Sequence, residues 1–399
     1  MSNTNTRTNH ILPSFDNTEI AFKAKKNKDL LRSYLLFKAI GINWLVKVGP
    51  TLVEMSFKIG LPVKALIKST VFNQFCGGES MDDCEATIDS LYQYQIGSIL
   101  DYSVEGKEAE AEFDHTMSET IDTVSKAKGN SKIPFCVFKV TGLARFALLE
   151  KVNSKLPLNA EEQQEFDRVK YRIEMICGHA YKSNVRIFMD AEESWIQDAI
   201  DALSREMMLK FNQSKAIVYN TIQLYRHDRF AFLQSSYEDA LKHNYFLGVK
   251  LVRGAYMEKE RLRATEQNYL SPIQPDKIAS DKDYNASLKF CIEHIDRISV
   301  CAGTHNESSS LLLAELMQQK GISNNDERIY FSQLFGMSDH ISYNLANAGY
   351  NVAKYLPYGP VESVLPYLFR RAAENTSVKG QSGRELTLIS NERKRRNSL

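Results

Sequence analysis

The sequence predicts an α/β fold, a distorted (β/α)8 barrel of the TIM type, preceded by a helical N-terminal segment. The length of 399 residues accommodates one barrel of about 250 residues together with additional helices. Eight short runs rich in β-branched residues follow one another, and helix-period sequence fills most of the intervals between them. Strands separated by helical crossovers form a parallel sheet, and eight such strands favour a closed barrel. We place the helical segment at residues 1–75 and the barrel at residues 76–399.

The eight expected strands are short, and turn or helix signals bound each of them. They cover residues 96–100, 135–140, 185–190, 217–221, 247–252, 298–302, 328–332 and 350–355. Only 22 residues separate the starts of the last two strands, at 328 and 350, so the helix between them must be brief. Before the third strand, Asn159 is followed three residues later by Glu162, which is the spacing of a capping box and predicts a helix start.

The composition excludes several classes of protein. Hydrophobic residues make up 43% of the chain and charged residues 25%, which is typical of soluble globular proteins and not of disordered chains or rods. The 50 basic and 49 acidic residues give a net charge of +1, without the basic excess of a nucleic-acid binder. The six cysteines are scattered, with neither a disulfide framework nor metal-ligand spacing. We therefore expect reduced thiols, no bound metal and no nucleic-acid partner.

The N-terminal part of the chain predicts where the protein resides. The polar N-terminus shows neither a signal peptide nor a transit peptide. The apolar region 35–67 is interrupted by charged residues such as Lys38, Lys47 and Glu54, so it lacks the roughly 20 apolar residues of a spanning helix. Packed helices are favoured there, although the lysines also suit peripheral contact with an anionic membrane. We expect a cytoplasmic protein, with the inner face of the cytoplasmic membrane as a contact and the mitochondrial matrix less favoured. The basic tail 392–397 is expected to be a solvated helix terminus.

Polar residues collect where the predicted strands end, which is where (β/α)8 barrels place their chemistry. These residues are Lys139, Thr141, Asp190, Gln223, Lys250, Arg253, Tyr256, Thr304, His305, Gln333 and Tyr355. One charge at a strand end is usually structural, but this many converging ends predict a site. The phosphate-loop, dinucleotide-binding, G-x-S-x-G and H-E-x-x-H motifs are absent from the sequence.

The expected helix after the last strand carries Tyr367, Arg370, Arg371 and Glu374 at positions i, i+3, i+4 and i+7. This spacing places the four residues on one helical face. Two adjacent guanidinium groups suit a carboxylate or a phosphate, which they can hold in bidentate fashion. Glu374 can fix their rotamers by pairing with either arginine. The alternative is a solvent-exposed charged face without a ligand, and the position at the mouth of the barrel favours the ligand site.

Four strings of residues closely resemble proline dehydrogenase. They are KLVRGAY at 250–256, MDAEE at 189–193, GTHN at 303–306 and YLPYGPVESVLPYLFRRAAEN at 355–375. The strings occur in family order, and the resemblance extends from about residue 76 to the C-terminus. Several independent motifs in order are far more specific than a single fingerprint.

The resemblance implies a monofunctional enzyme that oxidises L-proline to Δ1-pyrroline-5-carboxylate with non-covalently bound FAD and passes the electrons to a membrane quinone. It implies catalytic roles for Asp190 and Lys250, with Asp190 under the pocket and tied to Lys139. The implied substrate contacts are Lys139, Leu251, Tyr256, Tyr355, Tyr367, Arg370, Arg371 and Glu374. The implied flavin contacts are Ala191, Gln223, Lys250, Val252, Arg253, Gly254, Thr304 and His305. Many bacterial relatives have an arginine at the position of Lys250, and a lysine cannot replace its bidentate hydrogen bonds.

Reasoning from residue chemistry alone leaves other functions open. Oxidation of an amino acid needs a cofactor as hydride acceptor, because no side chain can accept a hydride. A barrel lyase or aldolase would instead use Lys139 or Lys250 as a Schiff-base amine. A barrel without catalytic activity that acts as a binding module is the third possibility. Flavin absorbance in the purified protein that bleaches on adding L-proline would distinguish the dehydrogenase from both.

Overall fold

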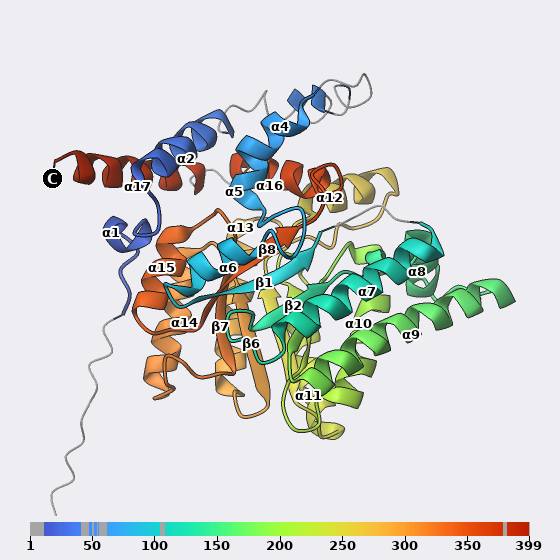
Figure 1. The fold of residues 1–399 in the computed structure, drawn as a ribbon. Coiled ribbons are helices and arrows are strands. Elements are labelled where there is room, and N and C mark those ends of the chain that lie inside the picture. The colour runs from blue at the N-terminus through green and yellow to red at the C-terminus, as the bar shows by residue number, and fades with distance from the viewer. Residues whose placement is uncertain are drawn as a thin grey trace, which may run out of the picture.

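The computed structural model describes residues 12–40, 48–49, 52–53, 55, 62–103, 108–377 and 381–398, with only the backbone described for residues 40, 372–377 and 381–382. Within these ranges, eight parallel strands close into a barrel in sequence order, as the sequence predicts (Figure 1). Helices cover its outer surface. The barrel closes where the first strand pairs with the last, with Ile99 opposite Tyr355.

Each expected strand is present, with boundaries that differ by up to three residues. The strands are β1 (Ile96–Tyr102), β2 (Phe135–Phe138), β3 (Arg186–Met189), β4 (Val218–Gln223), β5 (Leu247–Val252), β6 (Ile298–Gly303), β7 (Ile329–Leu334) and β8 (Val352–Tyr358). The predicted bounds of β5 are correct. β8 continues three residues beyond the predicted end because it pairs with β1 as far as Tyr102 and Tyr358.

One helix precedes the first strand of the barrel, and the others fill the intervals between the strands. They are α6 (Glu85–Tyr92), α7 (Glu110–Ala127), α8 (Phe146–Asn153), α9 (Ala160–Ser183), α10 (Ser194–Phe211), α11 (Arg229–Lys242), α12 (Met257–Glu266), α13 (Lys277–Glu293), α14 (Glu307–Gln319) and α15 (Asp339–Asn347). The predicted capping box starts α9, since Asn159 and Glu162 exchange backbone-to-side-chain hydrogen bonds of 2.8 and 2.9 Å. The predicted brief helix before the last strand is α15, with nine residues.

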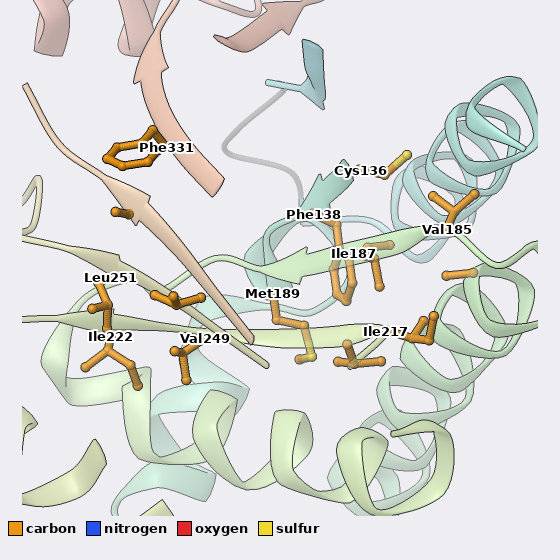
Figure 2. Packing of buried hydrophobic residues seen from close by; sticks show 14 of the residues in the cluster. Cys136, Phe138, Val185, Ile187, Met189, Ile217, Ile222, Val249, Leu251 and Phe331 are labelled. Atoms are coloured by element: carbon orange, nitrogen blue, oxygen red, sulfur yellow. The ribbon is translucent and has the colours of Figure 1, made fainter. Parts of the chain in front are cut away.

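Successive side chains of the strands point alternately outward and inward, which gives two packed layers, one under the helices and one inside the barrel. Side chains on the outer face of the strands, such as Ile187, Ile222 and Val249, pack under the surrounding helices (Figure 2). Inside the barrel, the rings of Phe135 and Phe188 stack with their centroids 4.5 Å apart. These aromatic rings fill the interior, so the polar residues at the carboxyl ends of the strands lie above a packed floor.

The N-terminal and C-terminal helices pack together beside the carboxyl ends of β7 and β8. The elements are α1 (Thr18–Ala21), α2 (Asn27–Ile40), α4 (Lys64–Ile67), α5 (Asn73–Phe75), α16 (Leu365–Ser377) and α17 (Gln381–Asn397). Phe37 and Phe75 from the first part join Val361, Leu365 and Leu388 from the last in one buried cluster. Most of the apolar stretch between α2 and α4, including residues 41–47 and 56–61, lies outside the described residues. The domain boundary at residue 75 remains a prediction.

The basic tail is not the solvated terminus that we predicted. Arg396 donates hydrogen bonds to the carbonyl oxygens of Phe22, at 2.9 Å, and Lys25, at 2.7 Å. Glu392 is fully buried and pairs with both Arg395 and Arg396. A run of basic residues therefore docks α17 on the N-terminal segment, because the fold brings backbone acceptors and a buried carboxylate to it. Among the described helices, none is long and apolar enough to cross a membrane.

Candidate functional site

The centre of the site is a buried ion pair between strands β3 and β5. Asp190 directly follows β3, and the Nζ of Lys250 donates to its Oδ1. The hydroxyl of Tyr355, from β8, donates to the other carboxylate oxygen at 2.8 Å. The Nζ of Lys250 also lies 5.0 and 5.2 Å from the ring centroids of Phe188 and Tyr355. The centre therefore combines residues from three strands that are distant in the sequence.

The partner of Asp190 adds to our predictions. The structure gives Asp190 an ion pair with Lys250, and the expected tie between Asp190 and Lys139 stays a prediction. Burial, followed by the charges of Asp101 and Asp190, raises the pKa of Tyr355 far above its ordinary value. Tyr355 consequently stays a hydrogen-bond donor to Asp190 at any physiological pH. Lys139 is placed at the end of β2, where its charge acts on Asp101.

Asp101 is a residue of the site that the sequence analysis missed. It lies near the end of β1, is 1% exposed and accepts a hydrogen bond from the hydroxyl of Ser103. Burial raises the pKa of Asp101, while the positive charge of Lys139 and the Ser103 hydrogen bond act in the opposite direction. The predicted strand ended at residue 100. The alternation Ile99, Asp101 along a longer strand is the signal that could have placed this carboxylate inside the barrel.

Glu192 and Gln223 form a second polar group between β3 and β4. The backbone N–H of Thr141 donates to Oε1 of Glu192 at 3.0 Å, and its hydroxyl donates to Oε2. Burial raises the pKa of Glu192 to about 7, although the hydrogen bonds from Thr141 lower it. Gln223 donates to the carbonyl oxygen of Glu192 at 2.9 Å. Ala191, beside Glu192, is half-buried.

The predicted flavin-contacting residues of β5 and β6 lie side by side. Arg253 donates to the side chains of Asp281, Thr304 and Ser309 at 2.7, 2.8 and 3.0 Å. Val252 at the end of β5 is half-buried, and Gly254 follows in a left-handed region with φ +139°. These strand ends form one continuous polar wall.

His305 continues this wall after β6. Its Nδ1 lies 2.9 Å from the hydroxyl of Ser338. Burial, together with the charges of Lys354 and Arg371, lowers the pKa of His305 to about 3. The imidazole is therefore neutral at neutral pH. A neutral ring nitrogen can contact a polar cofactor without adding a charge.

The helix α16 brings its predicted residues against aromatic rings. The guanidinium carbon of Arg371 lies 5.2 Å from the ring centroid of Tyr367, and that of Arg370 lies 5.9 Å from the ring centroid of Tyr256. Arg371 is only 7% exposed and Tyr367 only 4%. A solvent-exposed charged face would not bury these two side chains. The side chain of Glu374 lies outside the described residues.

Leu251 is placed away from the interior of the barrel. It is fully buried in the outer hydrophobic layer beside Ile222 and Val249 (Figure 2). Its neighbour Lys250 faces inward, and successive side chains of a strand point to opposite faces. The predicted contact between Leu251 and a substrate is therefore not supported. The likeness of the motif could not reveal this, because a motif does not state the direction of each side chain.

Two observations test whether this end of the barrel fits a flavin. The Oε1 of Gln223 is buried and has no hydrogen-bond partner within the described part of the chain. A buried acceptor of this kind is expected to receive an N–H group from a ligand. A Cβ on Gly254 would lie 2.3 Å from a ring carbon of Tyr225, so only glycine fits there. The unsatisfied acceptor of Gln223 fits a hydrogen-bonding cofactor, whereas the glycine is required by contact with the protein's own Tyr225.

Comparison with known proteins gives a consistent result. A family model described as "Proline dehydrogenase" matches residues 84–384. "Carbapenem antibiotics biosynthesis protein CarD" of Pectobacterium carotovorum subsp. carotovorum is 34% identical, with coverage of 82% of this chain and 85% of that protein. "Proline dehydrogenase 1, mitochondrial" of Dictyostelium discoideum is 32% identical, with coverage of 95% and 74%. "Hydroxyproline dehydrogenase" of Xenopus laevis is also 32% identical, with coverage of 94% and 88%.

Solved structures show the same fold. A crystal structure of proline utilization A from Bdellovibrio bacteriovorus, described as inactivated by N-propargylglycine, superposes with a TM-score of 0.71 at 21% identity. The match covers 90% of this chain but only 38% of that one. At this identity the likeness supports the barrel fold and carries no residue roles.

Proposed function

The chain belongs to the proline dehydrogenase family, and on this premise we propose that it oxidises L-proline to Δ1-pyrroline-5-carboxylate with non-covalently bound FAD, whose electrons pass to a membrane quinone. The main support is the division of the barrel mouth into two sets of residues. Arg370 and Arg371 of α16 lie against the rings of Tyr256 and Tyr367. Gln223, with its unsatisfied Oε1, lies on β4. The first set suits an amino-acid carboxylate, and the second suits a cofactor.

Each substrate contact follows from ordinary side-chain chemistry. Arg370 and Arg371 bind the proline carboxylate as charge-assisted hydrogen-bond donors. Tyr367 and Tyr256, each already against a guanidinium group, enclose the apolar ring of the substrate. Tyr355 is held in one orientation by its hydrogen bond to Asp190 and forms a further wall. Lys139 adds positive charge at the end of β2.

The protein supplies position and electric field, and the flavin, when bound, supplies the hydride acceptor. Gln223, Arg253, Gly254, Thr304 and His305 would hold the cofactor. Asp190 holds Lys250 in place, so that an ammonium group keeps one position inside the barrel. The substrate amine must be neutral, so that its nitrogen lone pair can form the C=N bond as a hydride leaves the adjacent ring carbon. The packed aromatic floor excludes water from below.

The competing functions predict different chemistry at Lys250. A Schiff-base lysine must lose its proton to attack a carbonyl group. The Nζ of Lys250 is engaged in an ion pair with Asp190 and is not free to attack a carbonyl group. The lyase alternative is therefore less well supported at Lys250.

The test is the colour of the purified protein. We expect flavin absorbance that bleaches on anaerobic addition of L-proline, with trans-4-hydroxy-L-proline tested beside it. Acid precipitation should release the flavin into the supernatant. Flavin retained in the precipitate would contradict non-covalent binding. Colourless protein that borohydride links covalently to a carbonyl substrate would support the lyase. A protein that shows neither the flavin bleaching nor the covalent link would support the binding module.

The cellular location remains a proposal. Several relatives, such as the Dictyostelium discoideum and Arabidopsis thaliana proteins, are mitochondrial by name. We propose a cytoplasmic location, with access to quinone at the inner face of the cytoplasmic membrane. Fractionation of the native host tests this proposal, since a matrix protein would separate with mitochondria.

A further inference from the structure

We propose that the C-terminal helix α17 is part of the cofactor site, because its residue Glu385 positions the imidazole of His305 through Ser338. The inference rests on the proposed function, in which His305 contacts the flavin. The helix α17 lies at the outside of the molecule beside α2, far along the chain from the strand that carries His305 (Figure 1). Glu385 is a positioning residue in this proposal, since it acts through two hydrogen bonds.

The first step is the contact between Ser338 and His305. Ser338 is fully buried directly before α15, and its hydroxyl lies 2.9 Å from Nδ1 of His305. Its backbone is left-handed, with φ +51° and ψ +42°. A non-glycine residue adopts this conformation at an energetic cost, so its surroundings must hold it. The orientation of His305 therefore depends on what holds Ser338.

The second step is the contact between Ser338 and α17. The backbone N–H of Ser338 donates to Oε1 of Glu385 at 2.5 Å. Glu385 is only 3% exposed, and the charge of Glu385 acts on the nearby Lys354. Lys354 in turn pairs with Asp339 at 2.9 Å and donates to the carbonyl oxygen of Met337. Charged groups thus hold residues 337, 338 and 339 in succession.

The third step connects the same helix start to a second flavin-contacting residue. The hydroxyl of Ser342 donates to Oε1 of Gln333 at 2.7 Å. Gln333 donates from its amide nitrogen to the carbonyl oxygen of Thr304 at 3.2 Å. The side chain of Thr304 accepts from Arg253 at 2.8 Å. A displacement of the start of α15 would therefore reach both Thr304 and His305.

The attachment of α17 does not require Glu385. Leu388 and Ile389 bury the helix in the hydrophobic cluster, and Glu392 holds the two arginines that bind the N-terminal segment. Glu385 and Glu392 lie seven residues apart, two turns along the helix, and both are buried carboxylates. Of these two carboxylates, Glu385 accepts from Ser338 and Glu392 pairs with Arg395 and Arg396, while Arg384 separately joins α17 to Glu307. Glu392 therefore offers a matched control on the same helix.

The experiment compares flavin release from the holoenzymes of wild type, Glu385→Ala and Glu392→Ala. Release on dilution is followed by the rise in flavin fluorescence, and each melting temperature is measured separately. Loss of a hydrogen bond to a charged group should weaken flavin binding by about tenfold or more in Glu385→Ala. Glu392→Ala should lower the melting temperature while its flavin affinity stays within about twofold of wild type. Equal loosening of the flavin in both variants would mean a general packing role and would overturn the proposal.

Two milder variants keep the test decisive if Glu385→Ala does not fold. Glu385→Gln retains a carbonyl oxygen for the Ser338 N–H and should recover most of the flavin affinity. Ser338→Ala removes only the hydroxyl, and it should weaken flavin binding and change the visible flavin spectrum. The effects of Glu385→Ala and Ser338→Ala should be less than additive, because both act through His305. Wild-type flavin release in Ser338→Ala would overturn the proposal.

Failure of the proposed function is visible separately. Flavin that stays bound to the wild-type protein but is not reduced by proline would contradict the proposed function and leave the positioning role intact. A wild-type protein that binds no flavin would overturn both. The order of the measurements, wild type before variants, distinguishes these cases.

Discussion

Two buried ion pairs of the same chemical kind lie on opposite sides of the barrel wall. Asp201 and Arg229 lie outside the strands, between α10, α11 and β4, and the carboxylate also accepts from Gln197 and Asn220. Asp190 and Lys250 lie inside, at the open end of the barrel. The outer pair holds three elements together, whereas the inner pair borders the proposed substrate. Burial alone therefore does not distinguish structural charges from functional ones. The side of the barrel wall that a pair faces does distinguish them, because a ligand can reach only the open end of the barrel.

The largest expected effect is on stability, from breaking the outer pair. Asp201→Ala removes the near carboxylate of the buried Arg229 and leaves it only the more distant one of Asp228, at 3.9 Å. Removal of one partner of a buried pair costs about 3–5 kcal/mol. We expect urea denaturation to show this loss of stability. In the protein that is still folded, proline should reduce the flavin at a near-normal rate. A loss of proline turnover without a loss of stability would contradict a purely structural role for the outer pair.

Removal of the inner cation should act mainly on turnover. Lys250→Met deletes a fixed positive charge beside the proposed flavin, whereas Tyr355 and Thr221 still donate to Asp190. Loss of one preorganised group costs about 10²- to 10³-fold in rate. Stopped-flow reduction of the flavin by proline measures the loss. Stability should fall less than in Asp201→Ala, and the reverse order would show that the inner pair is mainly structural.

A third buried cation, Arg371, tests whether α16 contributes to the substrate site as the inner pair does. Truncation of one partner in a desolvated charge pair costs about 2–5 kcal/mol, so kcat/KM for proline should fall roughly 30- to 3,000-fold in Arg371→Ala. Most of the loss should be in substrate binding, with flavin content unchanged. Arg371→Lys should recover only part of it, because a lysine cannot form the bidentate contact.

The second variant of this test is Arg370→Ala, at the neighbouring residue on α16. A solvent-exposed charged face would leave turnover intact in both variants, since surface substitutions usually change stability by less than about 0.5 kcal/mol. Near-wild-type kinetics in both would therefore remove Arg370 and Arg371 from the substrate site.

The smallest effect is a pH dependence caused by Glu192. Its folded pKa is about 7, above the ordinary value of 4.5, so the folded state binds more protons between these values. This group therefore stabilises the fold at low pH, and its contribution is lost as the pH rises from about 4.5 to 7. The slope is at most about 1.4 kcal/mol for each pH unit. Glu192→Gln, which keeps partners for Thr141, should flatten this part of a plot of melting temperature against pH. An unchanged profile would contradict the conclusion that burial raises the pKa of Glu192.

The residues at strand ends were the most predictable part of the site. Parallel strands of a barrel end at one face, so Lys139, Asp190, Gln223 and Lys250 had to lie near one another once the strands were recognised. Asp101 was missed because the end of a strand depends on its neighbour. β1 continues to Tyr102 because β8 pairs with it, and the alternation of Ile99 and Asp101 becomes informative only once that length is known.

The sequence by itself determined the parallel barrel, the capping box of α9 and the residue types at the mouth, because periodicity and local hydrogen bonding are properties of neighbouring residues. Only the tertiary structure decided that Asp190 pairs with Lys250, that Leu251 faces the helices and that the basic tail docks on α1 and α2. Each of these depends on the distance and direction between residues far apart in the chain. The closure of the barrel and the packing of the terminal helices set those distances, and they emerge only when all eight strands are in register.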